Sequence, residues 1–288
     1  MINICSPQSP RIVRSTAELR ALTVAWRATD QRVALVPTMG ALHEGHLSLI
    51  RLARRQAPKV IVSLFVNPAQ FGPEEDFQSY PRDEARDAQM LAAAGCDLLY
   101  APSPAAIYPP GFATTVAVGG LTCFMEGAAR PGHFSGVTTV VAKLIIQCAP
   151  HVAVFGEKDY QQLQVIRRLV ADLDLPVEII AGPIARDPDG LALSSRNAYL
   201  TTRQRVIAPT LNRALQVAAS AMAAGTPAAV AEADARRILE VAGFDAVDYL
   251  EARSAGTLER LAGVVSVPAR VLAAARLGGI RLLDNVPI

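Results

Sequence analysis

Two histidines, His43 and His46, lie in segment 37–46 (PTMGALHEGH), which also contains two glycines. The apolar run 32–36 before it predicts a buried strand, and apolar residues at helical spacing in 47–55 predict a helix after it. Such a turn directs free backbone N–H groups and the positive end of a helix dipole at one point. We therefore expect an anion there, and we predict a binding site for nucleotide phosphates.

The segment PTMGALHEGH has several other interpretations. The spacing of Gly40 and Gly45 is that of a P-loop, but His46 stands where that motif requires lysine, which disfavours a Walker-type kinase. The histidines could bind zinc, yet the HExxH spacing is absent and no third ligand is close in sequence. Two surface histidines in a polar turn are the plainest alternative. The strand-to-helix context favours phosphate, and the segment resembles the HIGH-type motif of class I synthetases and nucleotidylyltransferases, whose histidines contact ATP phosphates.

The composition excludes several classes of protein. The chain has 288 residues, 51% of them apolar, which suffices for one large domain or two smaller ones. A net charge of +2 gives no reason to expect a nucleic-acid partner. Four cysteines without a CxxC pair indicate reduced thiols, and the N-terminus lacks the form of a signal peptide. The most apolar region, 137–155, is interrupted by polar residues, so we expect no membrane span and a cytoplasmic location.

Further polar residues follow other predicted strands. The apolar runs 59–66 and 152–155 predict strands buried on both faces. The polar residues just beyond them are Asn67, Gln70, Lys158, Asp159 and Gln162. Because ligands bind beyond the carboxyl ends of strands in an open parallel sheet, we expect these residues on the same rim as the two histidines. Lys158 could neutralise phosphate charge there.

The alternation of strands and helices between Arg32 and Ala181 predicts an α/β fold, with a Rossmann-like, doubly wound parallel sheet. The expected strands are 32–36, 59–66, 96–100, 114–118, 152–155 and 177–181, and the expected helices are 15–29, 47–55, 81–95, 137–148 and 160–173. Alanine-rich helices follow at 201–224 and 227–242, and then strand-like runs at 246–251, 270–275 and 280–284. We predict a domain boundary near Ala185, with a Rossmann-like domain at 1–185 and a smaller α+β domain at 186–288.

Two polar loops have less specific sequences. The glycine-rich loop 127–136 contains Arg130 and His133, and a plain turn is favoured there over a lid. The loop 187–197 contains two serines followed by Arg196, which can bind phosphate through charge-assisted hydrogen bonds. Its Ser-Ser-Arg-Asn sequence is also common at helix caps.

Five ordered segments together resemble the pantothenate synthetase (pantoate–β-alanine ligase) family, over nearly the whole chain. They are PTMGALHEGH at 37–46, FVNPAQF at 65–71, RPGHFSGV at 130–137, FGEKDYQQL at 155–163 and LALSSRN at 191–197. The family joins the carboxylate of pantoate to the amine of β-alanine at the expense of ATP. The resemblance implies that activity here, with Mg²⁺ required and a homodimer as the assembly.

The resemblance also implies roles for individual residues. It makes His46 the catalytic histidine, with His43 and Lys158 beside it. It implies that Gln70 and Gln162 hold pantoate, that Gln70 also touches β-alanine, and that Asp87 lies near magnesium. The residues implied to bind ATP are Met39, Gly40, Ala41, Leu42, His43, Glu44, Gly45, His46, Gly156, Glu157, Lys158, Asp159, Ala185 (through its backbone), Leu193, Ser194, Ser195 and Arg196.

Other positions in the matching segments have no role that the resemblance assigns. They include Asn67, Arg130 and His133. Ala69 stands where methionine is usual and could loosen the wall of the pantoate pocket, and Ser135 stands where aspartate or arginine is frequent.

Elementary chemistry agrees with an acyl-adenylate route. A carboxylate is a poor acyl donor, so activation with ATP is needed, and negative charge builds on the phosphates as pyrophosphate leaves. No cysteine or serine lies in a triad-like setting. Because water would hydrolyse the intermediate, we expect residues 186–288 to act as a lid. A nucleotidyltransferase with a phosphorylated acceptor would need more cations beside the amide-rich rim, and an RNA-binding module would need a basic stripe.

Overall fold

The computed structural model describes residues 9–73, 75 and 77–288, and these form two compact units. The first unit comprises the described residues through Thr122, together with Glu126–Gly156 and Val165–Gly182. The second comprises Cys123–Met125, Glu157–Gln164 and Pro183–Ile288. The predicted domains 1–185 and 186–288 stay predictions.

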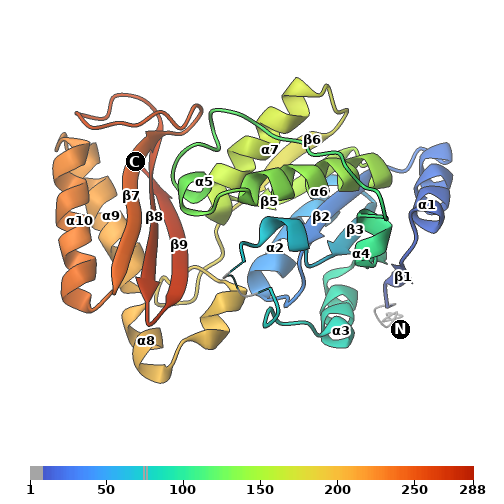
Figure 1. The fold of residues 1–288 in the computed structure, drawn as a ribbon, viewed down its shortest axis with the longest axis horizontal. Coiled ribbons are helices and arrows are strands. Elements are labelled where there is room, and N and C mark those ends of the chain that lie inside the picture. The colour runs from blue at the N-terminus through green and yellow to red at the C-terminus, as the bar shows by residue number, and fades with distance from the viewer. Residues whose placement is uncertain (1–8, 74, 76) are drawn as a thin grey trace, which may run out of the picture. The chain divides into compact units, whose positions relative to one another are not determined.

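The first unit contains a six-stranded parallel sheet with the strand order β1-β4-β3-β2-β5-β6 (Figure 1). Its strands are β1 Arg11–Val13, β2 Val33–Thr38, β3 Lys59–Leu64, β4 Leu98–Tyr100, β5 Val152–Gly156 and β6 Glu178–Gly182. Central β2 pairs with β3 and β5, and residues 33–36 of β2 are fully buried. The chain order reverses between β2 and β5. The predicted doubly wound parallel sheet is confirmed.

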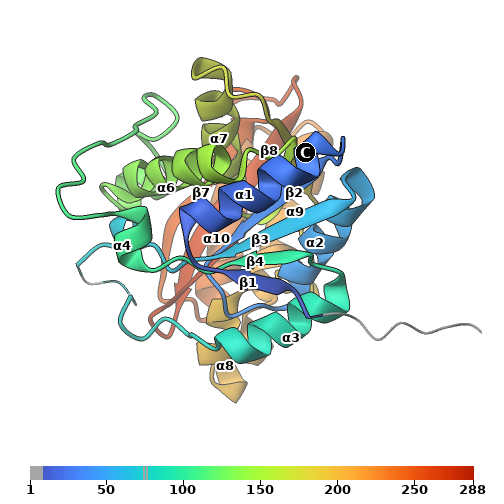
Figure 2. The same ribbon diagram turned by 90° about the vertical axis from the view of Figure 1, so that its right-hand side faces the viewer.

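Helices cover both faces of this sheet, with α1 and α6 on one face and α2 and α3 on the other (Figure 2). The longer helices are α1 Thr16–Ala28, α2 Glu44–Gln56, α3 Glu84–Ala94, α6 His133–Cys148 and α7 Tyr160–Asp172, and the short ones are α4 Pro104–Ile107 and α5 Glu126–Ala129. Right-handed crossovers that run in opposite directions from β2 and β5 require this two-sided arrangement. The carboxyl ends of β2, β3 and β5 therefore open at one edge, where the order reverses.

The strand predicted at 114–118 is wrong. The backbone N–H of Val116 donates to the hydroxyl of Thr139 at 3.0 Å, and the Thr138 hydroxyl donates to the Val116 carbonyl at 2.6 Å. The backbone groups of this extended segment therefore form hydrogen bonds with side chains of α6 instead of with a neighbouring strand.

Other elements also differ from the sequence prediction. Strand β1, Arg11–Val13, was not predicted because its three residues are too few for a period to show. Helix α6 begins at His133 instead of 137, directly after Gly132 in a left-handed conformation. The helix predicted at 201–224 divides into α8 Thr202–Ile207 and α9 Thr210–Ala223 next to Pro209, whose missing N–H cannot continue a helical ladder.

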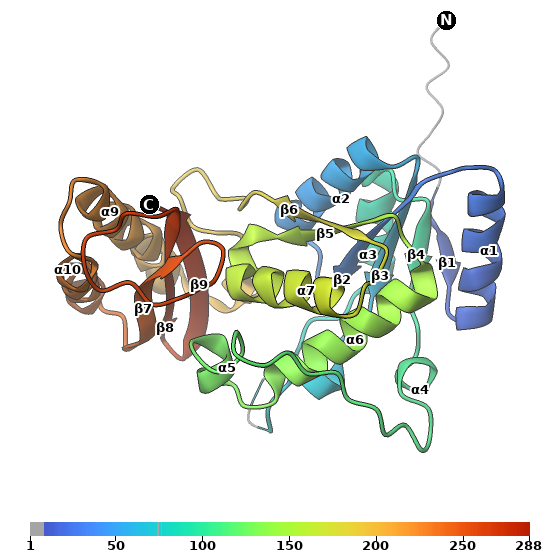
Figure 3. The same ribbon diagram turned by 90° about the horizontal axis from the view of Figure 1, so that it is seen from above.

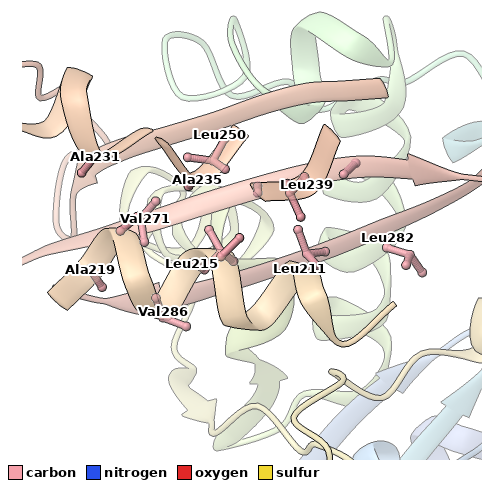
Figure 4. Close-up of a cluster of buried hydrophobic side chains, with 14 of the residues drawn as sticks. Leu211, Leu215, Ala219, Ala231, Ala235, Leu239, Leu250, Val271, Leu282 and Val286 are labelled. Atoms are coloured by element: carbon pink, nitrogen blue, oxygen red, sulfur yellow. The ribbon is translucent and has the colours of Figure 1, made fainter. Parts of the chain in front are cut away.

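The second unit contains an antiparallel sheet in the order β7-β8-β9, and α9 and α10 lie on one face of it (Figure 3). The elements that follow α9 are α10 Ala228–Ala242, β7 Ala246–Ser254, β8 Ala269–Leu277 and β9 Ile280–Pro287. The buried faces of the two helices are rich in alanine, which allows close helix contact, and leucines such as Leu215 and Leu239 fill the space above the sheet (Figure 4). The predicted combination of helices and strands in the C-terminal part of the chain is thereby confirmed.

Within the described residues, no helix is long and apolar enough to cross a membrane. Cys96 and Cys148 are buried free thiols, and Cys123 is an exposed free thiol. Burial raises the pKa of Cys96 to about 12 and also raises that of Cys148. Cys5 lies outside the described residues.

Helix α9 offers a matched test of the second core. Leu215 is fully buried and Val217, two residues later, is 52% exposed. We expect Leu215→Ala to lower the free energy of unfolding by about 2–5 kcal/mol, because it opens a cavity. Val217→Ala should change it by less than about 1 kcal/mol. Urea unfolding followed by circular dichroism measures both, and equal losses would show that the core is not packed as described.

Candidate active site

A buried carboxylate holds the turn between β2 and α2. Asp87 of α3 is 1% exposed and accepts backbone N–H groups from Ala41 at 3.0 Å and Leu42 at 2.9 Å. The turn reaches this carboxylate through two successive left-handed residues, Gly40 with φ +88° and Ala41 with φ +51°. A Cβ on Gly40 would lie 3.0 Å from the Asp87 Oδ2, so close approach as well as the backbone angle favours glycine.

The two histidines cap the start of α2. His43 is the N-cap residue, and its Nδ1 accepts the Gly45 N–H at 3.1 Å, while the Nδ1 of His46 accepts the His43 N–H at 3.3 Å. The ring centroids are 4.1 Å apart. Since a nitrogen that accepts a hydrogen bond carries no proton, each neutral ring has its proton on Nε2. Both imidazoles therefore present an Nε2–H donor.

This geometry corrects the expectation that the turn offers free backbone N–H groups. The N–H groups of Ala41 and Leu42 are taken by Asp87, and those of His43 and Gly45 are taken by imidazole nitrogens. An anion at this turn would therefore be met by imidazole N–H groups and by the dipole of α2. The sequence could not reveal this, because the acceptor from α3 is more than forty residues away.

Asp87 was predicted to lie near magnesium, and that placement stays a prediction. Both of its oxygens already accept backbone N–H groups. Burial raises the pKa of this carboxyl, and the bonds from Leu42 and Ala41 oppose that rise. In the described part of the chain, no group of three or more His, Cys, Asp or Glu side chains could hold a metal ion. These contacts suit a role for Asp87 in anchoring the turn, and they do not suit a role as a direct ligand of a resident metal.

Gln70 lies beyond β3, in the short 3₁₀ helix Pro68–Gln70, and both ends of its amide are held. Its Nε2 lies 3.0 Å from the sulfur of Met39, and its Oε1 accepts from the Asn67 Nδ2 at 3.1 Å. Asn67 is 1% exposed, and its Oδ1 accepts from the Tyr108 hydroxyl at 2.8 Å. Burial raises the pKa of Tyr108 to about 12, against the opposing effect of the bond to Asn67. Tyr108 is therefore a supporting residue that no sequence motif indicated.

The glycine-rich segment 127–136, for which the sequence favours a plain turn, is partly helical and contains a buried histidine. His133 is 8% exposed, and its Nδ1 lies 2.9 Å from the Gln70 carbonyl oxygen, while its Nε2 lies 3.1 Å from the Arg130 guanidinium. The neutral ring therefore donates from Nδ1 and accepts at Nε2. Arg130 also makes two bonds of 2.7 Å to the carboxylate of Glu75. Glu75, which carried no sequence signal, thus orients Arg130 and through it His133.

Backbone packing adds a second constraint near Gln70. A Cβ on Gly136 would collide with the carbonyl oxygen of Ala69. Only glycine at this position lets the first turn of α6 lie directly against the 3₁₀ helix, where the Gly136 carbonyl accepts the Nδ2 of Asn67 at 3.1 Å.

The remaining predicted residues belong mainly to the second unit. Lys158 lies in the 3₁₀ turn Glu157–Asp159, with its Nζ 3.8 Å from the Asp159 carboxylate. The Ser194 hydroxyl caps the 3₁₀ helix Ser195–Tyr199 by accepting the Arg196 N–H at 3.4 Å, so the helix-capping interpretation of this sequence holds for the backbone. The Ala185 carbonyl accepts the Leu193 N–H at 2.9 Å.

The predicted site residues thus form two sets, one in each unit. The first unit holds Met39, Gly40, Ala41, Leu42, His43, Glu44, Gly45, His46, Gln70, Asp87 and Gly156, and the second holds Glu157, Lys158, Asp159, Gln162, Ala185, Leu193, Ser194, Ser195 and Arg196. That both sets face one nucleotide stays a prediction.

The fold and the site define an α/β protein with a Rossmann-like, doubly wound parallel sheet, whose central strand β2 leads into the turn of His43 and His46. The family model of pantoate–β-alanine ligases matches residues 11–287. The pantothenate synthetase of Caulobacter vibrioides is 57% identical over 97% of this chain and 99% of its own length, and that of Rhodospirillum rubrum is 55% identical over 96% and 98%.

Solved structures agree with these relatives. A pantothenate synthetase from Thermus thermophilus has a TM-score of 0.90 and 48% identity, covering 96% of this chain and 98% of that chain. A Francisella tularensis pantoate–β-alanine ligase, solved with an ATP ligand and β-alanine, has a TM-score of 0.82 and 34% identity over 96% and 97%. This chain belongs to the pantoate–β-alanine ligase family, and it is an enzyme of that family.

The two roles considered for Asp87 can be separated by experiment. In Asp87→Asn, an amide NH₂ replaces one acceptor, so a buried backbone N–H loses its partner and stability should fall by about 1–3 kcal/mol. The Mg²⁺ concentration for half-maximal activity should stay unchanged. Glu84→Gln on the same helix is the control, because the exposed ion pair that Glu84 makes with Arg14 should be worth at most about 1 kcal/mol. A raised Mg²⁺ requirement with unchanged stability would instead make Asp87 a metal ligand.

Buried His133 predicts a loss of stability in acid. Burial and the charge of Arg130 lower its pKa below the usual 6.5, against the opposing effects of Gln70, Glu126 and Glu75. Because the folded state resists protonation, this contribution is complete above pH 6.5 and declines as the pH falls below it. The stability difference between the wild type and His133→Asn should therefore shrink between pH 7.5 and pH 5 in urea unfolding. A difference independent of pH would contradict this account.

Proposed function

We propose that this chain joins pantoate to β-alanine through a pantoyl-adenylate. In the first step, a pantoate carboxylate oxygen forms a bond to the α-phosphorus of ATP, and the bond to the bridging oxygen breaks, so pyrophosphate leaves with the electron pair. In the second step, the β-alanine amine forms a bond to the acyl carbon, AMP leaves, and the nitrogen loses a proton. The observation that carries this proposal is the pair of Nε2–H imidazoles after β2, at the edge where the strand order reverses.

The phosphates are the proposed ligands of the cationic and hydrogen-bonding groups. His46 and His43 would donate Nε2–H bonds to the phosphate oxygens, where charge grows as pyrophosphate departs. Lys158 would supply a full positive charge, and Ser194, Ser195 and Arg196 would supply further donors. Preorganisation supports the imidazole roles, because each ring is already fixed through its Nδ1.

Pantoate is the proposed ligand of Gln70 and Gln162. The Gln70 amide is held between Asn67 and Met39, so it can present a fixed orientation to hydroxyl and carboxylate groups. A neutral amide suits an acid that must stay nucleophilic, because a full positive charge would stabilise the ground-state carboxylate. The relative from Francisella tularensis, solved with β-alanine, supports β-alanine as the second substrate. Gln70 is proposed to touch it as well, as the family resemblance implies.

Three further expectations belong to this proposal. Magnesium would enter with ATP as part of the substrate, since Asp87 does not fit a direct ligand. Residues 186–288 would act as a lid that protects the acyl-adenylate from water. The family resemblance supports a homodimer in the cytoplasm.

One assay tests the first step directly. With pantoate and without β-alanine, the enzyme should catalyse exchange of labelled pyrophosphate into ATP. We expect His46→Ala and Lys158→Ala each to lower this exchange at least about 10²-fold, because each removes a group that stabilises the departing phosphates. His151→Ala and Lys59→Ala are matched controls outside the site and should exchange at nearly the wild-type rate. Absence of pantoate-dependent exchange in the wild type would refute the adenylate route.

A further inference from the structure

A buried asparagine on β9 forms hydrogen bonds with the turn that contains Lys158. Asn285 is 1% exposed, and its Nδ2 donates to the Glu157 carbonyl at 2.9 Å and to the Lys158 carbonyl at 3.0 Å. Both hydrogens of the amide are thereby used on two consecutive carbonyls of one short 3₁₀ turn. All of these residues belong to the second unit.

Arg270 of β8 fixes the orientation of that amide. Its Nε donates to the Asn285 Oδ1 at 2.7 Å, which places the amide nitrogen toward the two carbonyls. Its Nη2 lies 3.4 Å from the carboxylate of Glu157, and its guanidinium lies over the ring of Tyr160 at 4.5 Å. Arg270 therefore contacts the turn on both sides of Lys158 as well as the asparagine that holds it.

The preceding residue, Asp284, anchors the other predicted ATP segment. It is 3% exposed and accepts two bonds from Arg186, at 2.6 and 2.8 Å, and one from the Asn212 Nδ2 at 3.1 Å. Arg186 in turn donates to the Gly190 carbonyl at 3.0 Å and forms a β-bridge with Ala192. The loop that leads into Leu193–Arg196 is thus fixed by Asp284.

Consecutive residues of a strand point to opposite faces of the sheet. Asn285 therefore points from one face of β9 toward the turn of Lys158. Asp284 points from the other face toward Arg186, which holds the loop before Leu193. The Asn285 N–H also donates to the Asp284 Oδ1 at 2.7 Å, so the two sets of hydrogen bonds are linked. Neither residue belongs to any of the matching sequence motifs.

We propose that Asp284 and Asn285 are positioning residues that set the two nucleotide-binding segments of the second unit, with Asn285 acting on catalysis through Lys158. This inference rests on the proposed role of Lys158 in the adenylation step. A turn of three residues has few bonds of its own to resist displacement, so the two bonds from Asn285 determine where the Lys158 backbone lies. A misplacement of a catalytic group by about 1 Å can cost about 10²-fold in rate.

The test uses the full-length enzyme and pantoate-dependent pyrophosphate exchange. Asn285→Ala removes both bonds, and Asn285→Asp keeps the acceptor for Arg270 but replaces the donor to the carbonyls. We expect each to lower the exchange rate by about 10- to 100-fold. Val286→Ala is the matched control, because the neighbouring Val286 is buried in the core of the same unit and makes no such bond. It should lose stability in urea unfolding while exchanging within about threefold of the wild type.

A double-mutant cycle separates positioning from general structural damage. If Asn285 acts through Lys158, then Lys158→Ala combined with Asn285→Ala should exchange no more slowly than Lys158→Ala alone. Multiplicative losses, or an Asn285→Ala rate equal to that of Val286→Ala, would overturn the inference. If Lys158→Ala itself exchanged at the wild-type rate, the proposed function of Lys158 would fail instead. Should Asn285→Ala not fold, Asn285→Asp takes its place in the cycle.

Discussion

The bond between the Asp87 carboxylate and two backbone N–H groups is the interaction on which the candidate site depends. It holds two left-handed residues in place after β2, and so it decides where α2 begins. It also places a negative group beneath a turn predicted to bind phosphates. The imidazoles of the same turn carry Nε2–H groups, which can offset the negative charge of Asp87 toward a phosphate. Each ring is fixed by the hydrogen bond that its Nδ1 accepts at the start of α2. Backbone donors thus hold both the loop and the two imidazoles.

The other polar residues of the candidate site are likewise held by hydrogen bonds from buried neighbours. Gln70 is held by Asn67, which is held by Tyr108, and its carbonyl is held by His133, which is supported by Arg130 and Glu75. In the second unit, the sheet holds the turn of Lys158 in a similar manner. Residues expected to touch substrates, such as Gln70, are thus oriented by buried neighbours that were not expected to touch them. Buried polar networks of this kind lose orientation when one partner is removed.

The sequence predicted much of the fold, because buried parallel strands appear as continuous apolar runs such as 59–66 and 152–155. It also predicted the turn at His43 and His46, since strand, glycines and helix are local signals. It could not predict the roles of Asp87, Tyr108, Glu75 and Asn285, because their partners lie far away along the chain. The segment 114–118 was mistaken for a strand because β-branched residues favour extended backbone whatever satisfies it, here two threonines of α6.

The distribution of thiols gives the molecule a convenient chemical handle. Cys96 and Cys148 are buried, and their raised pKa values keep them protonated, so alkylating reagents should spare them in the folded protein. Cys123 is exposed and lies in the three-residue segment Cys123–Met125, which groups with the second unit although both flanking stretches group with the first. With Cys5 replaced by serine, a maleimide fluorophore on Cys123 would report on that segment as substrates are added.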